Sequence, residues 1–169
     1  MTKLHRLKPI KETLDAAYHR YARHAFIADD PLHIPHSFSS KEDKEIAGFF
    51  AAVFAWGQRV TIINKTKDLL KRMDNTPFDF VCQHTEEDLK RIEGFVHRTF
   101  NSTDALFFID ALRRIYQKEG GLERVVSAKI TSRDTTVEAG LNHLYHTIFN
   151  VDYVPKRSRK HLAAPCKGS

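Results

Sequence analysis

The chain has 169 residues, a formal net charge of +6 at pH 7 and an isoelectric point near 9.4. Hydrophobic residues at 41% and charged residues at 28% are ordinary for a globular domain, so they exclude disorder of the bulk and permit a sizeable core. The basic balance permits an anionic partner without proving one. The start of the chain has no secretory signal, and no apolar run approaches the ~20 residues of a membrane span. With two separate cysteines as well, we expect a reduced, cytoplasmic protein without a membrane partner.

The first predicted element is a helix over residues 14–25, where apolar side chains recur at helical spacing. The sequence Asp30-Pro31, with Pro35 shortly after it, predicts an extended connection behind this helix.

The most informative stretch covers residues 40–59. Ser40 followed by Asp43 predicts a capping box at a helix start. Residues 46–56 are almost all apolar, so we expect a central helix that its neighbours cover on most sides. Gly57 suits the left-handed position that ends a helix. A new amphipathic run begins at Val60, so Gln58 and Arg59 should lie at a tight corner between two helices.

The second half of the chain also shows a helical pattern. A helix over residues 105–117 should end at Gly120-Gly121, and Thr135 with Glu138 predicts a capping box before another helix. Short extended pieces are open alternatives for residues 125–126 and 149–155. The fold class is therefore all-α, and residues 1–169 are interpreted as one helical domain that is incomplete at its C-terminus.

The titratable residues give no self-contained catalytic set. His33 with His36 and His143 with His146 have suitable spacing, but neither pair has an obvious third ligand, so we expect structural histidines, no metal and no cofactor. Acids 42–45 and 86–88 are interpreted as solvated or first-turn helix residues. No nucleophile motif and no phosphate-binding glycine loop are present.

Three segments together resemble the helix-hairpin-helix DNA glycosylase superfamily. They are the buried helix with its Gly57-Gln58-Arg59 corner, the stretch from Gly94 to Asn101 with Arg98, and the ending Leu162-Ala-Ala-Pro-Cys-Lys-Gly-Ser169. The ending is similar to the first helix and turn of the hairpin, with Cys166 in place of a usual glycine. A helical hairpin with a polar corner is the alternative reading of the first segment.

A closer resemblance is to an uncharacterised bacterial family, domain of unknown function 2400, which is similar to 8-oxoguanine glycosylases. The matching motifs are Asp30-Pro31-Leu32, Pro35-His36, Glu45 to Phe49, Gly57-Gln58-Arg59, Gly94-Phe95, Arg98-Thr-Phe100, Ala111 to Arg114 and Lys167-Gly168-Ser169. In that family the second hairpin helix, its reactive Lys and a Leu-Asp-x-His segment would follow Ser169. The resemblance therefore implies the front part of such a protein, with no catalytic residue of its own.

The resemblance also implies where DNA would bind. Gln58 and Arg59 would face the duplex, with Arg98 in the neighbouring turn, and Lys167 and Gly168 would grip a phosphate. The basic residues that precede the hairpin would add phosphate contacts; they are Arg157, Arg159 and Lys160. A solvated charged tail is the alternative reading of that run.

Three functions remain open at this stage. They are the front part of a base-excision enzyme, a DNA-binding module without chemistry, and a protein-interaction domain or folded remnant. In full-length relatives later helices would cover part of the central helix. We therefore expect Phe49, Phe50, Phe54 or Trp56 to be partly exposed, and the chain either to form a homodimer through that apolar face or to bind a hydrophobic dye.

Overall fold

The computed structural model of the chain describes residues 3–168. Helices make up 64% of the protein and strands 2%, which confirms the all-α prediction. In the first half the elements are α1 (Lys3–Tyr21), α2 (His24–Ile27), α3 (His33–His36), α4 (Lys41–Val53), α5 (Arg59–Arg72), α6 (Pro77–Gln83) and α7 (Glu86–Lys90). In the second half they are β1 (Val96–His97), β2 (Phe100–Asn101), α8 (Ser102–Arg114), the π-turn η1 (Ile115–Glu119), α9 (Leu122–Ser127), α10 (Glu138–Phe149), η2 (Ser158–Lys160) and η3 (Pro165–Lys167).

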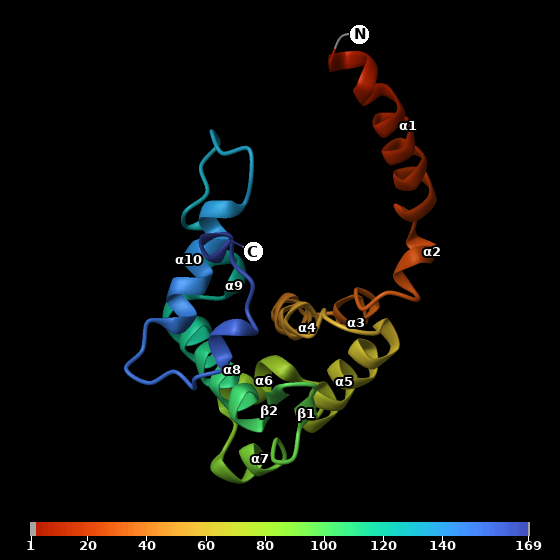
Figure 1. The fold of residues 1–169 in the computed structure, drawn as a ribbon. Coiled ribbons are helices and arrows are strands. Elements are labelled where there is room, and N and C mark those ends of the chain that lie inside the picture. Colours follow the sequence, from red (N-terminus) through yellow and green to blue (C-terminus); the bar gives the residue numbers. More distant parts are fainter. Residues whose placement is uncertain (1–2, 169) are drawn as a thin grey trace.

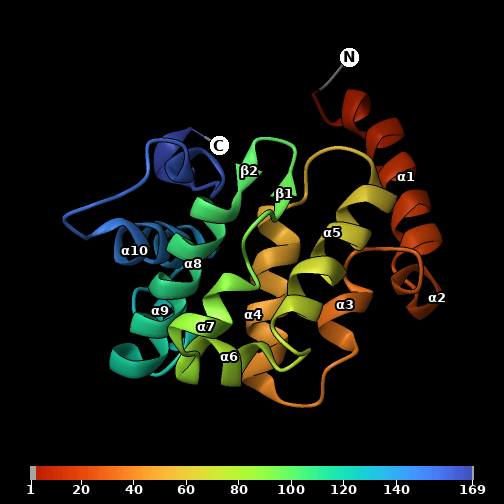
Figure 2. The ribbon, with the colours of Figure 1, turned by 90° about the horizontal axis from the view of Figure 1, so that it is seen from below.

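Helix α4 is central, as the sequence predicts, and lies between α5 and α8 (Figure 2). Ser40 caps its start, because the Ser40 hydroxyl accepts a hydrogen bond from the Asp43 backbone N–H at 3.1 Å. The predicted capping box is only half formed. The Asp43 carboxylate accepts the Ser40 hydroxyl and the distant Phe78 backbone N–H, so it ties α4 to the start of α6.

The main core consists of aromatic and aliphatic side chains from α4, the β1–β2 hairpin and α8. Phe50, Phe54, Phe95, Phe100 and Phe108 are completely buried there. Several of their rings meet edge to face, an arrangement that stabilises aromatic clusters beyond their simple burial. This core fixes the hairpin and α8 relative to the end of α4.

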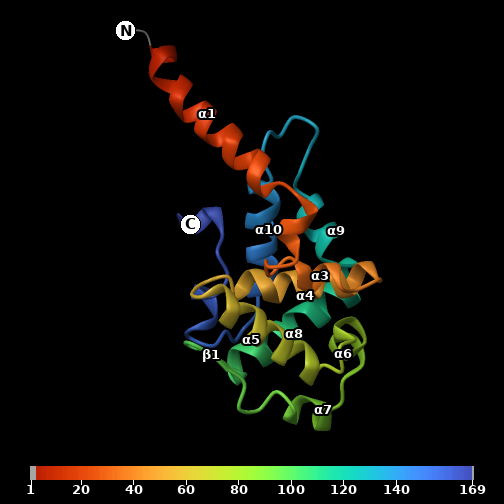
Figure 3. The ribbon, with the colours of Figure 1, turned by 90° about the vertical axis from the view of Figure 1, so that its right-hand side faces the viewer.

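Helix α1 projects away from the other helices (Figures 1 and 3). On the opposite side of α4, helices α9 and α10 and the C-terminal segment form a separate wall (Figure 1). The space between this wall and α4 contains the groove described below.

Several local expectations were wrong. Helix α4 ends at Val53, not at Trp56, because the chain turns there and the Trp56 indole N–H donates to the Val53 carbonyl at 3.2 Å. The segment His33–His36 is a short helix, where the sequence predicted an extended connection. Residues 125–126, for which a short extended piece was only an open alternative, belong to helix α9. Thr135 does not cap α10; Val137 is its N-cap residue, without a side-chain cap.

The expected exposure of the central aromatic residues is also mostly wrong. Phe49 is 8% exposed, and Phe50 and Phe54 are fully buried, because the β1–β2 hairpin and α8 already cover them. Trp56 alone of the four is half-buried. The open side of α4 and of the turn that follows it consists instead of small residues, Ala52 and Ala55.

Candidate functional site

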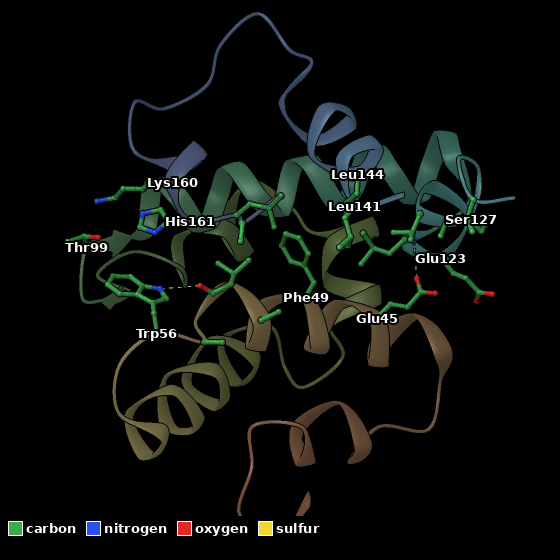
Figure 4. Close-up of a pocket in the computed structure, with 18 residues that line it drawn as sticks. Glu45, Phe49, Trp56, Thr99, Glu123, Ser127, Leu141, Leu144, Lys160 and His161 are labelled. Atoms are coloured by element: carbon green, nitrogen blue, oxygen red, sulfur yellow. Dashed lines mark hydrogen bonds between the residues drawn. The ribbon is translucent and has the colours of Figure 1, made fainter. Parts of the chain in front are cut away.

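A groove of about 910 Å³ runs along the open face of α4 (Figure 4). Helix α4 forms one side, and α9, α10 and the C-terminal segment form the other. Its middle is apolar and is lined by Phe49, Leu141 and Leu144. Its two ends differ in charge, because Lys160 and His161 line one end and Glu45 and Glu123 line the other.

Trp56 occupies the basic end of the groove. The Arg98 guanidinium lies over its ring, 5.0 Å from the centroid, and the His161 ring stacks on it at 6.0 Å. Lys160 and Thr99 line the same end. Because a cation over an indole face gains electrostatic energy, Trp56 holds the exposed Arg98 side chain in place.

Arg98 takes this position at the cost of a strained backbone. It begins the two-residue turn between β1 and β2 with φ of +56°, a conformation that non-glycine residues rarely adopt. Such strain costs of the order of 1–3 kcal/mol and concentrates at functional positions. Gly57 makes room for the side chain, because a Cβ at residue 57 would lie 2.7 Å from an Arg98 guanidinium nitrogen.

The basic C-terminal segment is anchored by Asp104, which is 2% exposed. Its Oδ1 accepts the buried Ser158 hydroxyl at 2.7 Å, and its Oδ2 lies 3.6 Å from the His161 Nε2. Oδ2 also accepts the Asn101 backbone N–H, which completes a capping box at the start of α8. With Ser158 and His161 turned inward, the neighbouring side chains Arg157, Arg159 and Lys160 are exposed.

Two buried histidines flank Trp56. Burial lowers the pKa of His161, and the Asp104 carboxylate only partly opposes this shift. Burial also lowers the pKa of His97, which packs against the edge of Trp56. The ring nitrogens of His97 make no well-directed hydrogen bond, although nearby backbone groups of Phe54 and Trp56 favour its charged form to a lesser degree. Both rings are therefore neutral at pH 7.

Glu45 organises the acidic end. Its Oε2 accepts hydrogen bonds from the Tyr116 hydroxyl at 2.7 Å and from the Leu122 backbone N–H at 3.0 Å. The Leu122 N–H is in the first turn of α9, where backbone N–H groups have no acceptor within the helix. Burial and this carboxylate together raise the pKa of Tyr116 above its usual range. The interpretation of Glu45 as a solvated or first-turn helix acid was wrong, because its side chain is only 16% exposed and the first-turn acids of α4 are Glu42 and Asp43.

The predicted DNA-binding residues fall into two groups. Arg98 and Lys160 lie at the basic end of the groove, and Gln58 and Arg59 are exposed immediately after Gly57. Gln58 is the N-cap residue of α5, but α4 already ends at Val53, so a connection of five residues replaces the predicted tight corner.

The second group lies against α10. The Arg159 guanidinium covers Phe149, and the Lys167 ammonium lies over Tyr145 and donates to the Arg159 carbonyl at 2.6 Å. Gly168, with φ of +72°, ends a 3-10 turn over Pro165–Lys167, which is shorter than the expected hairpin helix. Arg157 is also exposed.

Sequence reasoning missed the anchoring residues of the site, Asp104, Ser158 and His161. Asp104 gave a local signal, since it stands three residues after Asn101 as in a capping box. Its second role has no local signal, because Ser158 is 54 residues away along the chain.

Within residues 3–168, no three His, Cys, Asp or Glu side chains gather in a way that could hold a metal ion. None of the helices in that range has the length and apolar character required to cross a bilayer.

Of three comparisons with known proteins, only the one with protein families gives a match. No curated protein matches the chain, and no solved structure matches it either. The family described as "Protein of unknown function (DUF2400)" matches residues 30–169, which include α4, the hairpin, α8 and the whole groove. The chain therefore belongs to the DUF2400 family.

Proposed function

We propose that this domain is the front part of a glycosylase-like protein, and that it binds DNA weakly, without sequence preference, at the basic end of the groove. The observation that carries the proposal is the arrangement around Trp56. Arg98 is held over the indole, and Lys160 lies at the same end of an apolar groove. Cationic side chains beside an aromatic platform and a cavity are the common elements of sequence-tolerant binding to unpaired nucleotides.

Each group has a distinct role in this proposal. Arg98, Lys160 and the exposed Arg59 neutralise phosphates, which gives affinity but no sequence readout. An unstacked base enters the end of the groove between Trp56 and Thr99, where apolar contact replaces its stacking in the strand. Gln58 is exposed beside Arg59 and is available for hydrogen bonds to the strand.

The proposal includes no self-contained catalysis. The Asp104–His161 pair has the residue types of an acid–base dyad, but both side chains are 2% exposed and Asp104 is already used by Ser158 and Asn101. A general base must reach the proton that it abstracts, so we assign this pair to holding the basic segment in place.

The test is fluorescence anisotropy of labelled single-stranded and duplex oligonucleotides between about 25 and 200 mM salt. We expect binding that weakens steeply with salt. The double variant Arg98→Glu/Lys160→Glu should weaken it further. On duplex DNA it should also reduce the slope of log affinity against log salt by about 0.9 for each phosphate that the variant no longer neutralises.

The matched control is Lys118→Glu/Lys129→Glu, which changes the net charge equally on exposed residues outside the groove lining. It should retain most of the affinity. Equal losses in the two double variants would show that only the overall charge matters and would contradict the proposed site. The triple variant Arg157→Glu/Arg159→Glu/Lys160→Glu tests the C-terminal cluster, and unchanged binding would place the contact surface elsewhere.

A further inference from the structure

Helix α10 has a polar face that neither the core nor the groove uses. His143, His146, Thr147 and the C-cap residue Asn150 recur at spacings of three or four residues, which place them on one side of a helix. The two histidines are the pair for which the sequence offers no third metal ligand. By itself, such a polar stripe would be an ordinary solvated face.

Arg159 turns this face into one wall of a hollow. The chain after α10 leaves in a loop and turns back, so Arg159 lies against the end of the helix (Figures 1 and 2). Within residues 3–168, the hollow shares no lining residue with the groove, and none of its lining residues is acidic. Its volume is about 300 Å³, and it is lined by His143, His146, Thr147, Phe149, Asn150 and Arg159.

Arg159 is held in place by contacts that leave most of its N–H groups free. Its guanidinium carbon lies 5.0 Å from the centroid of the Phe149 ring, which is itself buried and stacks on Phe107 at 5.5 Å. The Arg159 carbonyl accepts a hydrogen bond from the Lys167 ammonium at 2.6 Å. A guanidinium that lies over a ring keeps its N–H groups at its edge, where an acceptor can reach them.

The carbonyl groups at the end of α10 are already engaged. Free carbonyl groups at the C-terminus of a helix disfavour a nearby anion. Here the Ile148 carbonyl accepts from the Arg114 guanidinium at 3.4 Å, and the Phe149 carbonyl accepts from Arg159 at 3.5 Å. Arg114 also pairs with Asp110, so Arg159 supplies the positive charge of the hollow.

The lining residues suit an oxyanion better than a cation. A guanidinium binds phosphate or carboxylate through paired N–H groups. Each histidine ring has at least one N–H donor in either charge state, and the Asn150 amide has further donors. A metal ion would meet the Arg159 cation, and no cluster of three metal-binding side chains exists in the part of the chain that the structure describes.

The arrangement of the donors favours phosphate over carboxylate. A carboxylate has two oxygens in one plane, whereas the oxygens of a phosphate group point in several directions. Donors approach the hollow from α10 on one side and from Arg159 on the other, which matches the phosphate. The volume is at the lower end of the range of ~300–1,000 Å³ for ligand pockets, so the hollow suits one phosphate group better than a whole nucleotide.

We propose that this hollow binds a phosphate group, with Arg159 as its charged ligand and His143, His146 and Asn150 as further donors. The inference does not rest on DNA binding at the basic end, because the hollow is separate from the groove. The phosphate group comes either from inorganic phosphate or from the end of a nucleic-acid strand. A terminal phosphate presents three unbridged oxygens to the hollow, whereas a phosphate within a strand presents only two.

Calorimetric titration of the full chain with inorganic phosphate, at constant ionic strength, tests the site. The wild type should bind in a saturable way. Arg159→Gln should weaken binding by roughly 10-fold or more, as expected for loss of hydrogen bonds from a charged donor. The matched control Arg133→Gln removes the same charge from an exposed residue outside the hollow and should bind like the wild type.

A second variant and a second measurement locate the phosphate. His143→Ala/His146→Ala changes the polar face of α10 without touching its buried face, and it should also weaken phosphate binding. In NMR spectra of the histidine rings, added phosphate should shift the signals of His143 and His146 but not that of His36 on α3. Arg159→Gln should remove these shifts at the same phosphate concentration, while circular dichroism shows that each variant is folded.

Oligonucleotides with a 5′-phosphate or a 5′-hydroxyl end distinguish the two sources. Tighter binding of the phosphorylated strand that Arg159→Gln abolishes would support a strand end. Equal binding of both strands, or of neither, together with binding of inorganic phosphate would support the free anion. The absence of saturable binding up to about 50 mM phosphate would overturn the proposal. Equal losses in Arg159→Gln and Arg133→Gln, or unshifted His143 and His146 signals, would overturn it as well.

Discussion

Replacing Asp104 with Ala should destabilise the domain by about 2–4 kcal/mol. The substitution leaves the Ser158 hydroxyl, which is fully buried, without its acceptor, and an unsatisfied buried polar group costs about 1–3 kcal/mol. It also removes the hydrogen bond from the Asn101 N–H at the start of α8, which contributes a further ~1 kcal/mol. The carboxylate beside the His161 ring is removed as well, but that ring is neutral at pH 7, so this change adds little.

Urea unfolding followed by far-ultraviolet circular dichroism measures this change, with Asp110→Ala as the matched control. Asp110 is on the same helix but its side chain is 66% exposed, and its pair with Arg114 should contribute less than about 1 kcal/mol. Equal unfolding midpoints for Asp104→Ala and Asp110→Ala would refute the argument that Asp104 anchors the C-terminal segment. Retention of full stability in Asp104→Ala together with a decrease in Ser158→Ala would refute it as well.

Three other predictions concern the histidines, the thiols and the chemistry. Burial lowers the pKa of His97, so the unfolded chain binds more protons than the folded chain below about pH 6.5. The free energy of unfolding should therefore fall as the pH drops from about 6.5 toward 5. His97→Leu should make this decrease smaller, as measured by urea midpoints at pH 7 and 5. Cys166 is exposed, whereas burial raises the pKa of the Cys82 thiol, so a disulfide reagent should modify Cys166 first, and equal rates would contradict the placement. The chain should neither excise bases from nor nick duplexes that contain 8-oxoguanine, uracil or a mismatch, and nicking that one substitution within residues 1–169 abolishes would contradict this.

The parts of the fold that the sequence predicted correctly depend on local interactions. Ser40 starts α4 because a serine at that position can cap the first turn, and the glycine pair 120–121 ends the helical run after α8 through positive φ values. The apolar run through residue 56 hid the real end of α4, because hydrophobicity alone does not distinguish a helix from a buried turn.

The candidate site was predicted only in part for the same reason. The start of the second helix beside Gln58 and Arg59 can be read from adjacent residues, because the amphipathic run begins there. The position of Arg98 over Trp56 depends on a strained turn 42 residues further along the chain, and that of Lys160 depends on the Asp104–Ser158 contact. The open groove beside α4 depends on packing between elements that are distant in sequence, so no local pattern indicates it.

The most direct test of DNA binding at the basic end uses the fluorescence of Trp56, the one tryptophan in the chain. Titration with an unlabelled single-stranded oligonucleotide at low salt should quench this emission in a saturable way, because a base is expected to enter beside the indole. Added salt should reverse the quenching, and Arg98→Ala should weaken it. DNA binding that leaves the Trp56 emission unchanged, or no binding at about 25 mM salt, would contradict the account.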